Sequence, residues 1–167
     1  SAGTNSGPGR AGRPPADAEA CFERARALRR TGKRDESLAS FDRAIALDPK
    51  HFRSHWKRAD VLYELNRFAE AVAGYDMAIA LRPKQLAPQV NRALALSCLM
   101  RYDEALAALA RAITMKPDNA DARVNRAFLL QDLRRLDEAL EDFETAASLN
   151  PDHADACWGK GELKLLL

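Results

Sequence analysis

The chain lacks the features that mark a secreted or membrane-spanning protein. Its three cysteines, Cys21, Cys98 and Cys157, are odd in number, lie far apart and form no CxxC pair. This spacing argues against a disulfide framework and against a zinc site. No apolar run approaches the ~20 residues that cross a bilayer, and the start has no apolar core of a signal peptide. We therefore expect a soluble protein of the cytoplasm.

Motifs of catalysis are also missing. The sequence has no glycine-rich phosphate loop, no nucleophile elbow and no supported set of Ser, His and Asp residues. His51 and His55 are spaced as in a zinc protease, but the glutamate that acts there as the general base is absent. We therefore expect a protein that is not an enzyme and that has no catalytic residue, no metal and no cofactor.

An excess of one charge is missing as well. The formal net charge is only +2, which does not indicate nucleic-acid binding by the whole chain. Residues 1–34 hold eight Arg and Lys against three Asp and Glu, while the remainder holds eighteen against twenty-one. No aromatic residues are interleaved with the basic cluster of residues 24–34, so it is a weak nucleic-acid signal. We expect a solvated basic helix there, and no nucleic-acid or membrane partner.

Large apolar residues are absent from the first sixteen positions. This segment contains four Gly and three Pro. It cannot bury enough apolar surface to offset the entropy cost of ordering. We expect residues 1–16 to be a disordered leader or linker and residues 17–167 to form the folded domain.

The chain does contain a repeat of fixed length. Four similar phrases, ALDP, ALRP, TMKP and SLNP, end at Pro49, Pro83, Pro117 and Pro151, each 34 residues after the last. A fixed period of this size is typical of stacked repeats. With the proline as position 32, the repeat predicts units at 18–51, 52–85, 86–119 and 120–153. A partial fifth unit, or terminal helix, occupies 154–167.

Small and large residues recur at fixed positions of the unit. Positions 8, 20 and 27 are small, whereas position 24 is Phe, Tyr or Leu. Positions 8 and 11 share one face of a helix, and positions 20, 24 and 27 share one face of a second. A small residue facing a large one lets two helices approach closely. Proline cannot continue a helix, so the second helix ends before it. With two helices in each full unit and one more at the end, the pattern predicts an all-α chain of about nine helices.

This pattern resembles the tetratricopeptide repeat (TPR), and the resemblance covers residues 18–167. The family favours a bulky apolar residue at position 4, which is held here by Cys21, His55, Gln89, Arg123 and Cys157. The resemblance implies a right-handed superhelix, an α-solenoid of antiparallel helix pairs, in which first helices line a concave groove and second helices form the convex back. It also implies a scaffold that binds a peptide or a partner protein.

In TPR arrays, positions 2, 5, 6, 9, 12 and 13 of the first helices tend to face the groove. On that basis the expected peptide-binding residues are Asn91, Asn125, Leu94, Phe128, Trp56, Lys57 and Asp121. An Asn side chain both donates and accepts hydrogen bonds, so two Asn one repeat apart suit the backbone of an extended peptide. The alternative is that both Asn merely solvate an exposed helix face.

The recurring Asn is similar to the asparagine ladder in the TPR arrays of O-linked N-acetylglucosamine transferases and their bacterial relatives. The match is partial, because position 6 is Glu23, Lys57 or Gly159 in the other units. This resemblance implies an alternative function, the substrate-recruiting arm of a longer glycosyltransferase. The residues with which another TPR subset clamps C-terminal carboxylates do not stand in the required units, so we expect no such clamp.

A positive charge recurs at position 7, beside the small position 8. The residues of this position-7 ladder are Arg24, Arg58, Arg92, Arg126 and Lys160. A long Arg stem covers apolar surface while its guanidinium reaches a carboxylate. We interpret the ladder as structural, paired with acidic residues of the second helices. The alternative is a basic ladder that contacts acidic ligands.

The last unit stops in an apolar run. A terminal repeat normally has a polar outer face, whereas residues 154–167 end on three leucines. We therefore expect either a fragment of a longer protein or a surface that pairs with another copy, giving a homodimer or a self-associating scaffold. The residues assigned to this surface are Trp158, Leu163, Leu165, Leu166 and Leu167.

Overall fold

The computed structural model describes residues 16–167, which are helical apart from short connections. The expectation for residues 1–16 lies outside the described residues except at Ala16, where the first helix begins. The helices are α1 Ala16–Arg30, α2 Arg34–Leu47, α3 Phe52–Glu64, α4 Phe68–Leu81, α5 Leu86–Cys98, α6 Tyr102–Met115, α7 Ala120–Asp132, α8 Leu136–Leu149 and α9 Ala154–Leu166.

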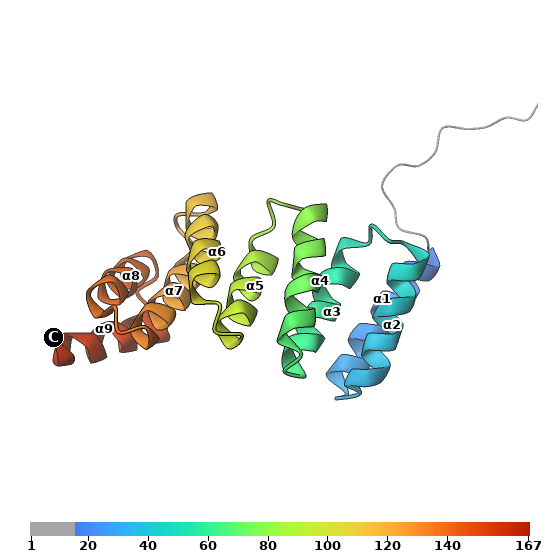
Figure 1. Ribbon diagram of the computed structural model, residues 1–167, viewed down its shortest axis with the longest axis horizontal. Helices are drawn as coiled ribbons and strands as arrows, with labels where there is room; N and C mark the ends of the chain where they lie inside the picture. Colours follow the sequence, from blue (N-terminus) through green and yellow to red (C-terminus); the bar gives the residue numbers. More distant parts are fainter. Residues whose placement is uncertain (1–15) are drawn as a thin grey trace, which may run out of the picture.

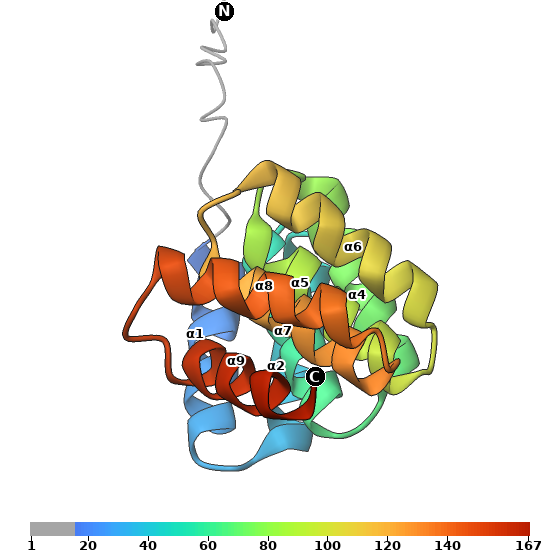
Figure 2. The same ribbon diagram turned by 90° about the vertical axis from the view of Figure 1, so that its left-hand side faces the viewer.

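Consecutive helices pack in pairs, and the pairs stack in a row (Figure 1). α1 packs on α2, α3 on α4, α5 on α6 and α7 on α8, while α9 packs on α8 and α7 at the end of the row. Viewed along the row, successive pairs are rotated relative to one another (Figure 2). Four helices begin at the first residues of sequence units, Phe52, Leu86, Ala120 and Ala154. The prediction of an all-α solenoid is confirmed for the described residues.

Each pair closes on the small residues that recur in the sequence. The position-8 residues Ala25, Ala59, Ala93 and Ala127 are fully buried, and so are the small residues at positions 20 and 27. The large side chains that fill the space between helices are Phe41, Tyr75, Leu109 and Phe143. In the first pair, the buried Ser37 hydroxyl donates to the Ala25 carbonyl at 2.8 Å. The close approach of small and large residues therefore holds each unit together.

α9 docks on the preceding pair through a glycine. A Cβ added at Gly159 would lie 2.5 Å from Cζ of Phe143. Ala156 and Leu163 are fully buried on the same helix. Position 6, which carries Asn in two earlier units, therefore has a packing role in the last one.

The two helices of each unit are joined by the same turn. The residue at position 15 has a positive φ: Gly32 at 78°, Asn66 at 59°, Met100 at 58° and Arg134 at 62°. The following N–H reaches back five residues, as from Arg135 to the Leu130 carbonyl at 2.9 Å, which is the Schellman arrangement. Gly and Asn adopt this backbone readily, whereas Met and Arg hold it at a steric cost of about 1–2 kcal/mol.

We predict that Arg134→Gly raises the free energy of unfolding by about 0.5–1 kcal/mol, because relief of the strained backbone exceeds the entropy cost of the added glycine. Ala39→Gly, at an exposed position inside α2, is the matched control and is expected to lower it by about 1 kcal/mol. Urea denaturation of both variants measures the difference. A loss of stability in Arg134→Gly would contradict the prediction.

Candidate functional site

The first helices of successive units come together on one side of the solenoid. α1 contacts α3, α3 contacts α5, α5 contacts α7, and α7 contacts α9. Within residues 16–167, no second helix contacts another second helix. The first helices are therefore the closer set, and we call the surface that they form the inner face.

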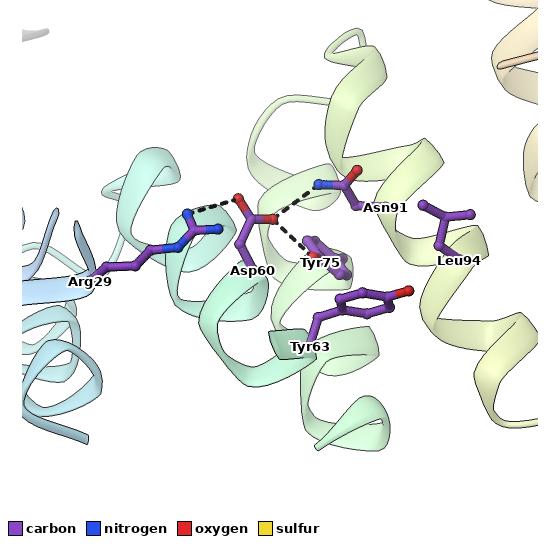
Figure 3. A pocket seen from close by; sticks show the side chains of 6 residues that line it. All are labelled: Arg29, Asp60, Tyr63, Tyr75, Asn91 and Leu94. Atoms are coloured by element: carbon purple, nitrogen blue, oxygen red, sulfur yellow. Dashed lines mark hydrogen bonds and ion pairs between the residues drawn. The ribbon is translucent and has the colours of Figure 1, made fainter. Parts of the chain in front are cut away.

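A hollow of about 210 Å³ opens at the junction of the first three units. Its side chains come from α1, α3, α4 and α5 (Figure 3). They are Arg29, Asp60, Tyr63, Tyr75, Asn91 and Leu94. This central hollow contains two of the residues expected to bind a peptide, Asn91 and Leu94.

Asp60 is the centre of a polar network in the central hollow. Only 10% of its side chain is exposed. Its Oδ1 accepts hydrogen bonds from Tyr75 Oη at 2.9 Å and from Asn91 Nδ2 at 3.0 Å. Its Oδ2 accepts one from Lys57 Nζ at 2.9 Å, and Arg29 Nη1 lies 3.7 Å away. Three donors and a second cation thus offset the cost of burying this carboxylate.

Tyr75 serves this network as a neutral donor. Burial raises the pKa of its hydroxyl above the ordinary value, and the neighbouring Asp60 carboxylate raises it further. The hydroxyl therefore keeps its proton at neutral pH and donates it toward Asp60. The other full units carry Phe or Leu at this position, so the hydroxyl is particular to the second unit.

The contact with Asp60 decides which way the Asn91 amide points. A carboxylate oxygen only accepts hydrogen bonds, so the NH₂ group of Asn91 must face it. The carbonyl oxygen of Asn91 points away from Asp60 (Figure 3). At Asn91 the inner face therefore offers a ligand a fixed hydrogen-bond acceptor.

Asn125, one repeat later, is not held in this way. Its side chain is half-buried and makes no hydrogen bond within the described part of the chain. Position 9 of this unit is Phe128, whose ring packs edge-on against Phe143 with centroids 5.1 Å apart. For Asn125 the residue that corresponds to Asp60 is Leu94, at position 9 of the preceding unit, and its side chain has no hydrogen-bond acceptor. The donors and the acceptor of the Asn125 amide therefore have no partner among residues 16–167.

The other expected binding residues make contacts within the protein. Trp56 packs on Phe52 with ring centroids 5.7 Å apart, and the Lys57 ammonium lies 3.7 Å from the centroid of the Trp56 ring. The Trp56 indole nitrogen is buried and has no acceptor among residues 16–167. Asp121 pairs with His153 Nε2 at 3.0 Å, yet 78% of its side chain is exposed. Solvent therefore reaches Asp121 freely.

Three members of the position-7 ladder form ion pairs with second helices. Arg58 Nε lies 2.6 Å from Asp42, and Arg92 Nε lies 2.5 Å from Asp76, each in the preceding unit. Arg126 instead forms a bidentate ion pair, at 2.6 and 2.8 Å, with the carboxylate of Asp142 in its own unit. The preceding unit has Ala110 where the first two units have Asp42 and Asp76, which accounts for the change of partner.

The remaining members differ, since neither Arg24 nor Lys160 forms an ion pair within residues 16–167. Glu144, the acidic residue in the corresponding position for Lys160, binds Lys164 at 2.7 Å instead. The ladder is therefore continuous in the sequence, but within the described part of the chain only its three central members are paired.

The surface assigned to self-association needs one correction. Leu163 is fully buried, because it faces the core formed with α8, and it is unavailable to a second copy. The other assigned residues are exposed, with exposed fractions of 59% for Trp158, 90% for Leu165, 64% for Leu166 and 63% for Leu167.

Sequence reasoning missed the carboxylate at the centre of the hollow. Asp60 stands at position 9 in the run RADVLY, between residues that are buried, Ala59 and Val61. A charge within such a run indicates a paired group, and Lys57 at the i−3 position was the available sign. Tyr75 gave no such sign, because an aromatic residue at position 24 fits the packing pattern without its hydroxyl.

Residues 16–167 lack the features of a membrane span and of a metal site. No helix there combines the length and the apolar character needed to cross a bilayer. No three His, Cys, Asp or Glu side chains in this range are grouped in a way that would hold a metal ion.

We predict that Asp60→Ala lowers the free energy of unfolding by about 2–4 kcal/mol, because it strands the buried Tyr75 hydroxyl and removes the partner of Lys57. Asp60→Asn keeps an acceptor and is expected to cost about 1 kcal/mol. Asp103→Ala, at an exposed site on α6, is the control, with a change within about 0.5 kcal/mol. Denaturant melts give all three values, and equal stability of Asp60→Ala and wild type would contradict the role of the network.

Several solved structures have a fold similar to that of this chain. YrrB, described as a TPR protein with an unusual peptide-binding site, has a TM-score of 0.73 and 24% identity, covering 90% of this chain and 77% of that one. MamA from Desulfovibrio magneticus RS-1 gives 0.81 and 18%, covering 92% and 87%. PilF of Pseudomonas aeruginosa gives 0.79 and 20%, covering 90% and 68%. At these identities the likeness concerns the fold.

Sequence comparison gives the family. No curated protein matches the chain significantly. Two family models, each described as tetratricopeptide repeat, match residues 22–85 and 98–157. These segments contain most of the helix pairs described above, including the central hollow's Asp60 and Tyr75. With its 34-residue units, its paired helices and these matches, the chain belongs to the tetratricopeptide repeat family.

Proposed function

We propose that the inner face binds an extended segment of a partner protein, on a path from the central hollow to Asn125. The observation that carries this proposal is the pair of Asn side chains one repeat apart. Asn91 offers a fixed carbonyl oxygen beside Leu94. Asn125 offers an amide that makes no hydrogen bond within residues 16–167.

These groups suit the backbone of a ligand more than any one of its side chains. The Asn91 oxygen accepts a backbone N–H, and the Asn125 amide pairs with a backbone N–H and C=O together. Leu94 and Phe128 add apolar contact beside them. Recognition of this kind tolerates many ligand sequences, and the specificity then comes from neighbouring pockets.

The fold supports the same conclusion at a coarser level. TPR solenoids serve as protein-interaction modules, and the fold relative YrrB is described as having a peptide-binding site. The residues of the inner face add detail to this fold-level conclusion. A non-catalytic binding module is the function that these features support best.

The test of this function uses peptides selected on the wild-type chain from a random display library. Asn125→Ala is expected to weaken their binding about three- to tenfold, because one or two hydrogen bonds to the ligand are lost. Asn125→Ala should leave the melting temperature unchanged. Asn91→Ala is less suitable as a test, because it would also remove a hydrogen-bond donor from Asp60. Ser148→Ala, exposed on the outer helix α8, is the matched control. Unchanged affinity in Asn125→Ala would contradict the proposed path.

A second candidate function is self-association through α9. Trp158 and Leu165 are seven residues apart, so they lie on one face of the helix, and both are exposed. Apolar patches of this kind mark contact surfaces.

Sedimentation velocity over a concentration series tests the second candidate. The wild-type chain is expected to dimerise with increasing concentration, and Trp158→Ser/Leu165→Ser is expected to remain monomeric because the apolar area is lost. Met115→Ser, which replaces an exposed methionine on α6, controls for a general loss of surface apolarity. A wild-type chain that is monomeric throughout the series rules this candidate out.

A further inference from the structure

A second hollow lies beside the central hollow, between α1 and α3. Its volume is about 400 Å³. The residues that line this basic hollow are Arg26, Arg29, Arg30, Arg34, Lys57 and Glu64. Arg29 lines both hollows, so the two adjoin on the inner face. The structure therefore gathers into one place the cations that the sequence spreads over its first two units.

Cations outnumber carboxylates in the basic hollow. Glu64 is the one carboxylate in its described lining. Two more carboxylates pair with its cations from outside: Glu23 lies 3.1 Å from Arg26, and Asp60 lies 2.9 Å from Lys57. Three carboxylates thus face five cations. The basic hollow keeps an excess of positive charge.

Glu64 accepts hydrogen bonds from the arginine groups that would donate to a ligand. Arg29 Nε donates to it at 3.0 Å, and Arg34 Nε donates at 3.3 Å. Burial acts to raise the pKa of Glu64, but the hydrogen bonds and charges of Arg29 and Arg34 outweigh it and lower this pKa. The side chains stay accessible, with 31% of Glu64 and 46% of Arg34 exposed. An incoming carboxylate therefore competes with Glu64 for the same donors.

We propose that the basic hollow binds an acidic segment of a partner protein through the side-chain carboxylates of its Asp and Glu residues. This inference rests on the proposed function, because the hollow continues the same inner face. The cations come from α1, α2 and α3 and are spread around the hollow. That arrangement suits several carboxylates along a chain, and complementary charge also speeds the encounter of the two partners.

The surroundings favour an acidic peptide over a nucleic acid. The described lining of the basic hollow contains no aromatic side chain on which a base could stack. Farther along the inner face, Asp121 and Asp132 are exposed. Single-stranded nucleic acids bind in grooves that are positive along their length, so these carboxylates would repel a phosphate backbone. A peptide avoids the repulsion by having its acidic residues at one end.

Fluorescence anisotropy with a labelled peptide of alternating Glu and Ser, amidated at its C-terminus, tests the inference. The same peptide with Gln in place of Glu is the neutral reference. We expect wild type to bind the Glu peptide about tenfold more tightly at low salt and to lose this preference as salt rises. Arg26→Ala/Arg30→Ala should weaken the Glu peptide about tenfold and leave the Gln peptide unchanged. Arg101→Ala/Arg135→Ala removes equal charge elsewhere and should change either affinity less than about twofold.

Glu64→Gln distinguishes a binding site from a merely basic surface. Because it removes the internal competitor for Arg29 and Arg34, it should tighten Glu-peptide binding about threefold or more. Glu104→Gln, which breaks an exposed pair with Arg101 on α6, should have no effect. Weaker or unchanged binding in Glu64→Gln overturns the proposal.

Further results of these binding experiments would overturn either the acidic-segment proposal or the proposed peptide path. Tighter binding of single-stranded DNA than of the Glu peptide, or binding only when the peptide has a free C-terminus, overturns the proposal. If Asn125→Ala still weakens the selected peptides while the charge variants have no effect, only this inference fails. If the charge variants behave as expected and Asn125→Ala has no effect, the proposed path along the third and fourth units fails instead.

Discussion

The close approach of the two helices in each unit is the constraint on which the rest of the structure depends. The small side chains at positions 8, 20 and 27 are fully buried, and the large side chain at position 24 fills the space between them. Because this spacing recurs every 34 residues, each unit stacks on the last in a similar way. The first helices then come together on the inner face. The packing therefore determines where every side chain of that face lies.

Differences between the units determine the chemistry of the inner face. The first two units contribute the cations around Glu64, and the second adds Asp60 and Tyr75. In the fourth unit, Asn125 stands at the position of Lys57 and Phe128 at the position of Asp60, so position 9 has no carboxylate there. The cations thus gather at the start of the row, whereas Asp121 and Asp132 are exposed on the inner face of the fourth unit. Asp60 links these properties, because it is the acceptor at the centre of the buried network and also fixes the orientation of the Asn91 amide.

The fold can be predicted from the sequence because the units repeat. The contacts of the site are harder to predict, because they join residues of different units. Period and size pattern predict the helix pairs, and four helices begin at the predicted residues. Asp60 meets Asn91 across 31 residues, and Arg29 meets Glu64 across 35. No local pattern reveals such pairs, although the repeat period places position 9 near position 6 of the next unit. The exposure of Leu163 was mispredicted for a similar reason, because its burial depends on docking against α8.

The central claim is that ligands bind to the first helices. Backbone NMR of the isotopically labelled chain, titrated with a peptide selected by its binding, tests it most directly. The account predicts that shifted amide signals lie in α1, α3, α5 and α7, with the largest changes near Asn91 and Asn125. Shifts concentrated on the outer sides of α2, α4, α6 and α8, with these signals unmoved, would contradict it.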